Sequence, residues 1–421
     1  MSSSLRSAVD RIGERGARRG NPFEATPFEA AVQHPFWSEG LRPFFLLGSA
    51  FAAVSIPLWV LLASGSIDLP LRGGMLAWHI HETLFGFVAA AMAGFLTTAV
   101  PQWTGAKPIA GLPLALLVLL WLAGRAAWAV SAALPGWAVA AADLAFLPAL
   151  CLALGPGIVR ARQWRNLPVI LLVLILAAAN AAMHAAALGE WPEGSMTGAR
   201  LGLLAVIVLV SLIGGRIVPA FTRNALAAAG RPVETATPAW LAAAGNLAVA
   251  VAGALIAIGA PPAAAGTAAL AAAGLAALRL SSWHGWKVRH VPLLWVLHLA
   301  WMWVPAGLAL YGLALFGIGV PEGAAIHALA VGAAATMVMA VSSRAGLGHT
   351  GRPLTAPRPV VAAYLLLTIS AVSRVLAALG TADGSLLLHL SAACWSGAFA
   401  LFFCVYLPIL TRPRLQPTPA P

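Results

Sequence analysis

The feature that most constrains this chain is a run of about 20 apolar residues that recurs from one end to the other. Each run is long enough to cross the hydrocarbon core of a bilayer as an α-helix. Hydrophobic residues make up 61% of the 421 residues and charged residues only 9%, whereas about a quarter of a soluble domain is charged. The sequence therefore predicts an all-α fold, a polytopic membrane protein of about 12 transmembrane helices.

The predicted spans are separated by short links that carry glycine, proline and arginine. They cover about residues 44–64, 75–100, 112–131, 136–155, 166–188, 199–219, 238–258, 262–280, 289–316, 322–343, 358–379 and 385–410. We expect a basic cytoplasmic N-terminal tail over residues 1–40, a single transmembrane domain over 41–411 and a short cytoplasmic C-terminal tail over 412–421. The first tail is polar and too long to be a signal peptide.

The basic residues indicate how the chain is oriented. With the N-terminus in the cytoplasm, most of the 25 lysines and arginines fall on the inner side, in the tail and in every second link. This distribution is the positive-inside bias of membrane proteins. The net charge of +12 is therefore a topology signal and does not indicate a nucleic-acid partner. The even number of spans places both termini in the cytoplasm.

Three spans that cross in the same direction end alike, in VPQWTG, VPAFTR and GLGHTG. Their threonines, Thr104, Thr222 and Thr350, are four helices apart each time. The second and tenth spans share a longer frame at a constant offset, in which His81, Gly86, Thr104 and Gly105 correspond to His327, Gly332, Thr350 and Gly351. Either chance produces these matches in an alanine-rich chain, or repeat units of four helices form three arcs around a pseudo-threefold axis.

The second span contains AWHIHETLFGF, residues Ala77–Phe87, with two histidines and a glutamate in an apolar stretch. An ionisable group in lipid costs several kcal/mol unless it is paired or ligated, so each is a functional candidate. The topology places five histidines from four helices in one outer layer, and a sixth, in the ninth span, near the midplane. The predicted metal ligands are His79, His81, His184, His327, His389 and the deeper His298.

The spacing of the HIH motif limits what its histidines can bind. Residues two apart on an α-helix point about 200° apart, so His79 and His81 are expected to serve two centres on opposite sides of the helix. Neutral imidazole ligates haem iron and copper, which favours two haems, or a haem and a copper ion, separated by one helix. Glu82 can deliver a proton, orient a ligand or bind metal, and the sequence leaves these roles open. Alternatively, each histidine forms a hydrogen bond to a neighbouring helix.

Two arginines, Arg125 and Arg374, share the outer third of the predicted membrane domain and need anionic partners. Apart from Glu82, the nearest acid within a span is Asp143, so the expected partners are the propionates of a bound haem. Asn180 lies one turn from His184 on the same predicted face. Further candidates for cofactor binding, whose role the sequence leaves open, are Arg216 and Arg352 in inner-surface motifs.

Five long motifs resemble those of the NnrS family. They are LRPFFLLG, WHIHETLFGFVAAAMAGFLTTAVPQWTG, GGRIVPAFT, LLWVLHLAWMWVP and SSRAGLGHTGRPL. The resemblance covers the chain after the tail and implies a bacterial inner-membrane protein of twelve spans that contains haem and copper and takes part in denitrification and defence against nitric oxide. The helix count and outer arginines are also similar to haem–copper oxidases, but no adjacent His-His pair lies on a middle helix.

The leading hypothesis is a haem- and copper-dependent protein that reduces nitric oxide, with one or two b-type haems. Glu82 and Asp143 would hand over protons. No CxxCH motif is present, so electrons would come from a quinol or a small cytochrome. Two other functions stay open: a non-catalytic haem protein that senses or sequesters nitric oxide, and a transporter of a metal or small molecule, which twelve helices with Pro and Gly breaks also suit.

Overall fold

The computed structural model describes residues 31–233, 237–381 and 383–416, and this part of the chain is helical with no β-strand. Twelve helical segments within it are long and apolar enough to cross a membrane. The chain is therefore a multi-pass, all-α membrane protein, as its sequence predicts. Most of the predicted N-terminal tail lies outside the described residues, as do residues 417–421.

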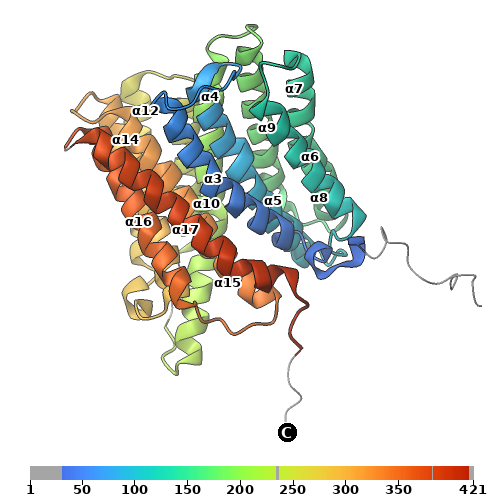
Figure 1. Cartoon of the computed structure of the whole chain (residues 1–421). Coiled ribbons are helices and arrows are strands. Elements are labelled where there is room, and N and C mark those ends of the chain that lie inside the picture. Colours follow the sequence, from blue (N-terminus) through green and yellow to red (C-terminus); the bar gives the residue numbers. More distant parts are fainter. Residues whose placement is uncertain (1–30, 234–236, 382, 417–421) are drawn as a thin grey trace, which may run out of the picture.

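We number the spans 1 to 12 in chain order (Figure 1). Spans 1 to 3 are α3 (Leu41–Ala63), then α4 (Gly74–His81) continued by η2 (Glu82–Val88) and α5 (Ala89–Thr104), then α6 (Leu112–Ala129). Spans 4 to 6 are α7 (Gly136–Leu144) with α8 (Phe146–Arg160), η3 (Trp164–Asn166) with α9 (Leu167–Ala187), and α10 (Gly194–Ala228).

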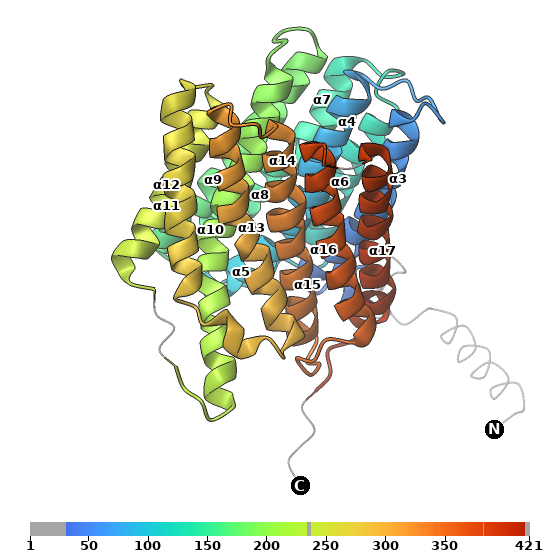
Figure 2. The same cartoon turned by 90° about the vertical axis from the view of Figure 1, so that its left-hand side faces the viewer.

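Spans 7 to 9 are α11 (Ala239–Ala257), α12 (Pro262–Ser281) and α13 (Pro292–Leu315), the last preceded by the short η4 (Gly285–Val288). Spans 10 to 12 are α14 (Glu322–His327) continued by η5 (Ala328–Ala335) and α15 (Thr336–His349), then α16 (Arg358–Leu379) and α17 (Gly384–Thr411). The longest helix, α10, has 35 residues and extends past its neighbours at the lower end of the bundle (Figure 2).

The start of the first span and the end of the last lie together, at what we call the terminal end of the bundle; the opposite end is the distal end. The Arg42 side chain donates hydrogen bonds to the carbonyl oxygens of Leu410 (3.0 Å) and Arg412 (2.7 Å). The short η1 (Pro35–Trp37) also packs against α3 and α17. Helical structure that packs on the bundle therefore already occurs within the predicted tail, before residue 41.

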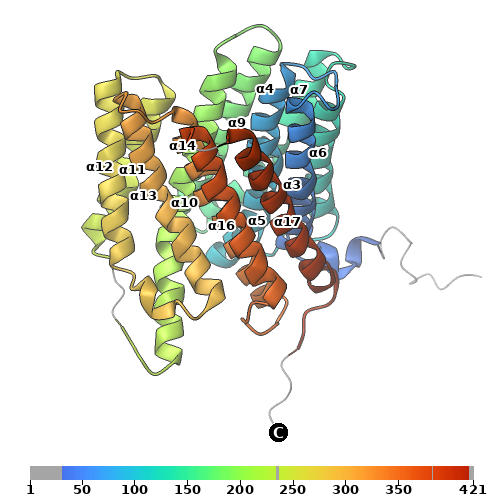
Figure 3. The same cartoon turned by 60° about the vertical axis from the view of Figure 1, so that its left-hand side comes forward.

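Spans 2, 6 and 10 contact one another. Spans 2 and 10 are the most deeply buried spans of the bundle. The remaining spans pack in three series of consecutive neighbours, 3–4–5, 7–8–9 and 11–12–1. Figure 3 shows α11, α12 and α13 on one side and α16, α17 and α3 in front. This arrangement agrees with three units of four helices, which the shared endings of spans 2, 6 and 10 predict.

Spans 2 and 10 share an unusual backbone feature. Each has a π-helical segment, η2 and η5, and these begin directly after His81 and His327, the first residues of the repeat frame. A π-helix accommodates an extra residue in the helix and is frequent at functional sites. Gly86 lies in η2 against Phe51, and Gly332 lies in η5 against Trp303, where any side chain would clash. The two spans therefore share both a local distortion and its tight packing.

Candidate metal and cofactor sites

Six polar residues from spans 2 to 5 gather in the distal half of the bundle, and all are buried. We call them the buried cluster: His81, Glu82, Arg125, Asp143, Asn180 and His184. Gly124 makes the cluster possible, because a side chain at that position would clash with Asp143 on the neighbouring helix. Groups this polar are stable in an apolar interior only when their hydrogen bonds are satisfied.

Arg125 finds its partners inside the protein. Its guanidinium donates to Glu82 Oε1 at 2.9 Å and also forms an ion pair with Asp143. Arg125 therefore does not need a haem propionate as its partner, and its predicted role at a propionate stays a prediction. Spans 3 and 4 pack as neighbours and bring Asp143 opposite Arg125, a proximity that residue depth alone did not reveal.

His81 lies at the centre of the buried cluster. Its Nδ1 faces Glu82 Oε1 at 2.9 Å, and its Nε2 faces Asp143 Oδ2 at 3.0 Å and Asn180 Oδ1 at 2.9 Å. His184 Nε2 lies 2.9 Å from the same Asp143 oxygen, which also accepts a hydrogen bond from the Asn180 amide at 2.8 Å. Both imidazoles therefore converge on one carboxylate oxygen.

This geometry fits a metal ion. One nitrogen each from His81 and His184 and one Asp143 oxygen lie within 4.8 Å of one another, and two imidazoles with a carboxylate are common ligands of copper and zinc. Glu82 would then orient His81 from its far nitrogen, as carboxylates do in metalloprotein sites. Because two carboxylates face a single arginine, the cluster accommodates one more positive charge, which a metal ion or a proton on an imidazole can supply.

A separate cavity of about 270 Å³ lies on another side of span 2, and we call it the histidine cavity. Its walls are largely apolar and come from spans 1, 2, 6, 9, 10, 11 and 12. The polar side chains that line it are His79, Thr83, Arg200, Tyr311, His327, Ser370, Arg374 and Ser391. An apolar pocket with a few convergent polar groups is typical of a cofactor or ligand site.

The two imidazoles of the histidine cavity are available as ligands. His79 stacks on Trp59, with ring centroids 4.3 Å apart, and no hydrogen bond to its ring is found among the described residues. His327 donates from Nδ1 to the Gly323 carbonyl oxygen at 2.6 Å, and its Nε2 has no partner in the part of the chain that the structure describes. Metal-binding histidines are commonly held in this way by their other nitrogen. His79 and His81 thus face different sites, as their spacing predicts.

Arg374 is half-buried and lines the histidine cavity. Within the described ranges it has no hydrogen-bond or ion-pair partner, so its guanidinium can still receive an anion from a bound group. Two free imidazoles, apolar walls and an unpaired arginine fit a haem, whose iron takes imidazole ligands and whose propionates need positive partners.

Sequence reasoning missed a polar group at the rim of this cavity. Arg200 donates two hydrogen bonds to the Glu322 carboxylate, each 3.0 Å long, and the Tyr311 hydroxyl donates to the same carboxylate. Arg200 is one of the few basic residues that depart from the positive-inside pattern. That departure, which Arg200 shares with Arg125 and Arg374, was the available signal.

Several predicted site residues lie elsewhere. His298 pairs with Thr222 Oγ1 at 2.9 Å, near the end of α10, which corrects its predicted midplane depth to the terminal half. His389 is exposed and pairs with a carbonyl of its own helix, so it does not join the other outer histidines. Arg216 binds Asn166 at 2.9 Å, and Arg352 follows α15 at the terminal end. None of these four lines the histidine cavity.

Comparison with known protein families shows to which family this chain belongs. The sequence model described as NnrS protein matches residues 35–414, which include all twelve spans. The chain belongs to the NnrS family. Membership indicates a role in nitric oxide metabolism and the binding of metal or haem. The match begins at the first residue of η1, in agreement with helical structure that packs on the bundle within the predicted tail. None of the curated proteins compared matches the chain.

Proposed function

We propose that this NnrS protein reduces nitric oxide to nitrous oxide in the bacterial inner membrane, with a b-type haem in the histidine cavity and copper in the buried cluster. The observation that supports it most strongly is that neighbouring histidines of span 2 face two different sites. His79 lines the histidine cavity, whereas His81 is held among the carboxylates of the buried cluster.

His79 and His327 would hold the haem, only one of them as a ligand of the iron so that nitric oxide can bind, and Arg374 would neutralise its propionates. When bound, a haem supplies an iron centre that takes up nitric oxide and transfers electrons. The largely apolar walls would exclude water from the reacting gas. Arg200 and Tyr311, which line the cavity, hold the Glu322 carboxylate, so a proton-bearing hydroxyl lies beside the place where protons are consumed.

The buried cluster would bind copper through His81, His184 and Asp143. Since it does not line the cavity, we assign the nitric oxide chemistry to the histidine cavity and an electron-transfer or structural role to the copper. The overall reaction combines two nitric oxide molecules, two electrons and two protons into nitrous oxide and water. Electrons would come from a quinol in the bilayer or from a small cytochrome.

The test is a measurement of nitric oxide consumption by the purified, haem-loaded protein under anaerobic conditions. We expect nitric oxide to disappear and nitrous oxide to form when a reduced quinol or a reduced small cytochrome is supplied. The His327→Ala variant should lose the haem absorption and the activity, whereas His389→Ala, an exposed histidine on α17, should keep both. Haem-loaded protein that takes up nitric oxide only once per haem with every donor would instead favour a sensing or sequestering role.

A further inference from the structure

A second apolar space lies nearer the terminal end of the bundle than the histidine cavity. It has a volume of about 80 Å³, and its lining includes Met92, Met337, Val206 and Ala334. Among its described lining residues, only Ser342 has a polar side chain. We call it the methionine chamber. It contains no charged group and none of the predicted metal ligands.

The methionine chamber and the histidine cavity follow one another along the same helices. On span 2, Leu84 lines the cavity and Val88 lines the chamber four residues later. On span 10, Ala330 lines the cavity and Ala334 lines the chamber. Four residues are about one helical turn, so the two spaces are one turn apart on both π-helical spans, and α10 contributes to both.

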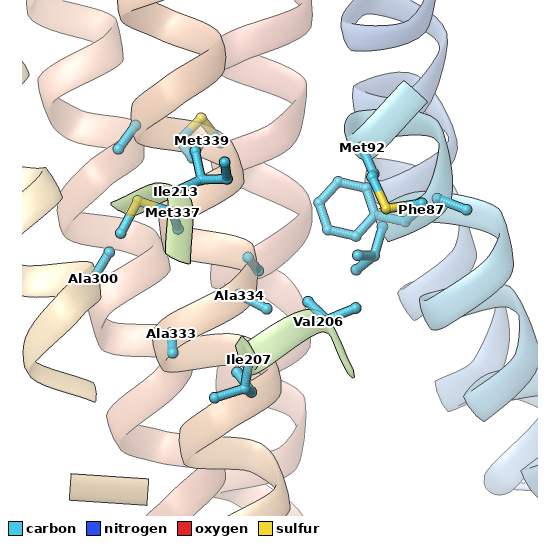
Figure 4. Close-up of a cluster of buried hydrophobic side chains, with 14 of the residues drawn as sticks. Phe87, Met92, Val206, Ile207, Ile213, Ala300, Ala333, Ala334, Met337 and Met339 are labelled. Atoms are coloured by element: carbon cyan, nitrogen blue, oxygen red, sulfur yellow. The ribbon is translucent and has the colours of Figure 1, made fainter. Parts of the chain in front are cut away.

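Figure 4 shows how the chamber is bounded. Met92 of α5 lies on one side, and Ala334 and Met337 of span 10 lie on the other, with Val206 of α10 between them. Small side chains such as Ala91 and Ala334 leave the space between these helices. Methionine is unbranched and adaptable, so these walls can yield to a small molecule in transit.

The wall of the chamber is not completely buried. Phe95, Leu209 and Ile217 line it and are only half-buried. The rim of the histidine cavity, in contrast, carries the polar Arg200–Glu322–Tyr311 group. The chamber therefore offers a more apolar approach to the cavity than this polar group does.

We propose that the methionine chamber is the route by which nitric oxide dissolved in the bilayer reaches the histidine cavity, an inference that rests on the proposed function. Nitric oxide is small and uncharged, so it partitions into apolar regions, and a space of about 80 Å³ admits a diatomic gas. The same walls disfavour charged species such as nitrite, because no group in the chamber compensates for a lost hydration shell.

Xenon tests the chamber itself, since it binds empty apolar cavities. A structure of the wild-type protein under xenon pressure should show xenon between Met92 and Met337. The Ala334→Leu variant should lose that site. Density for a lipid acyl chain in the chamber of the wild-type protein, or no xenon there, would overturn the proposal. Neither result depends on activity, so this test remains valid even if the protein reduces no nitric oxide.

Gas kinetics test the route. In haem-loaded protein, carbon monoxide association after flash photolysis should slow at least tenfold in Ala334→Leu, and also in Ala91→Leu on the facing helix, while the haem spectrum stays unchanged. Ala254→Leu adds the same volume on the exposed face of α11 and should leave the rate unaltered. Unchanged rates in both chamber variants would refute the route. Failure of the proposed function would appear separately, as haem-loaded wild-type protein that consumes no nitric oxide.

Discussion

At the scale of single residues, the molecule separates two kinds of histidine within its membrane spans. His81 and His184 are held by carboxylates and an amide in the buried cluster, whereas His79 and His327 keep a ring nitrogen free in the histidine cavity. Glu82 and Asp143, predicted as proton donors, lie in the buried cluster and hold Arg125. Their observed contacts fit positioning of His81 and Arg125 better than delivery of protons to the cavity.

The Asp143→Asn variant should destabilise the protein by about 3–5 kcal/mol, because removal of one partner leaves buried charges uncompensated. The measurement is the thermal unfolding midpoint of the detergent-purified protein. Asp68→Asn is the matched control, since Asp68 is exposed and should change stability by less than about 0.5 kcal/mol. Equal midpoints for the two variants would show that the network does not stabilise the fold.

Some side-chain positions could be predicted from the sequence, and others could not. The sequence identified the polar residues of the membrane domain, because each is expensive in lipid, and the spacing of His79 and His81 correctly predicted two directions. It did not show that Asp143 faces Arg125, or that the His389 ring pairs with a carbonyl oxygen of its own helix. Those facts depend on how helices are rotated about their axes, and an alanine- and leucine-rich helix carries little pattern that fixes its rotation.

At the scale of elements, spans 2 and 10 have the same construction: a histidine, then a π-helical segment with a glycine, then an α-helix with a threonine at its last residue or directly after it. Each threonine hydroxyl donates to the carbonyl oxygen four residues earlier, in Thr104, in Thr350 and also in Thr222 of span 6. The sequence frame suggested this correspondence between the spans. The π-helices were not predicted, because a local insertion of this kind has no distinct composition.

The Gly332→Ala variant should lower stability by about 1–3 kcal/mol, since the added methyl group would have to displace Trp303 from η5 and overpack the core. The experiment compares it with Gly274→Ala on α12, where the added methyl group has open space. That control should be neutral or stabilising by up to about 1 kcal/mol, because alanine is the better helix former. A neutral Gly332→Ala would mean that the glycine is not required by packing.

At the scale of the whole molecule, the other spans surround a centre formed by spans 2, 6 and 10. Composition and run length were sufficient to predict the number of spans, because the bilayer fixes the length of each helix. The predicted ends differ most where helices continue beyond the apolar run, as α10 does to Ala228. Alanine and arginine are good helix formers, so loss of hydrophobicity there does not end the helix.

The orientation of the whole molecule follows from its charges. The terminal end carries most of the arginines of the links, so we expect it to face the cytoplasm. In a chain with its cysteines replaced by alanine, Ser66→Cys at the distal end should react with a membrane-impermeant maleimide in spheroplasts. Thr355→Cys at the terminal end should react only after lysis. The reverse pattern would invert the topology and place both termini outside.

The central claim is that one helix separates two cofactor sites, with His79 facing one and His81 the other. It is tested most directly by haem spectra and elemental analysis of iron and copper in purified His79→Ala and His81→Ala. We predict that His79→Ala loses haem iron and keeps copper, whereas His81→Ala loses copper and keeps the haem spectrum. Loss of both metals from each correctly folded variant, or of neither, would contradict the account.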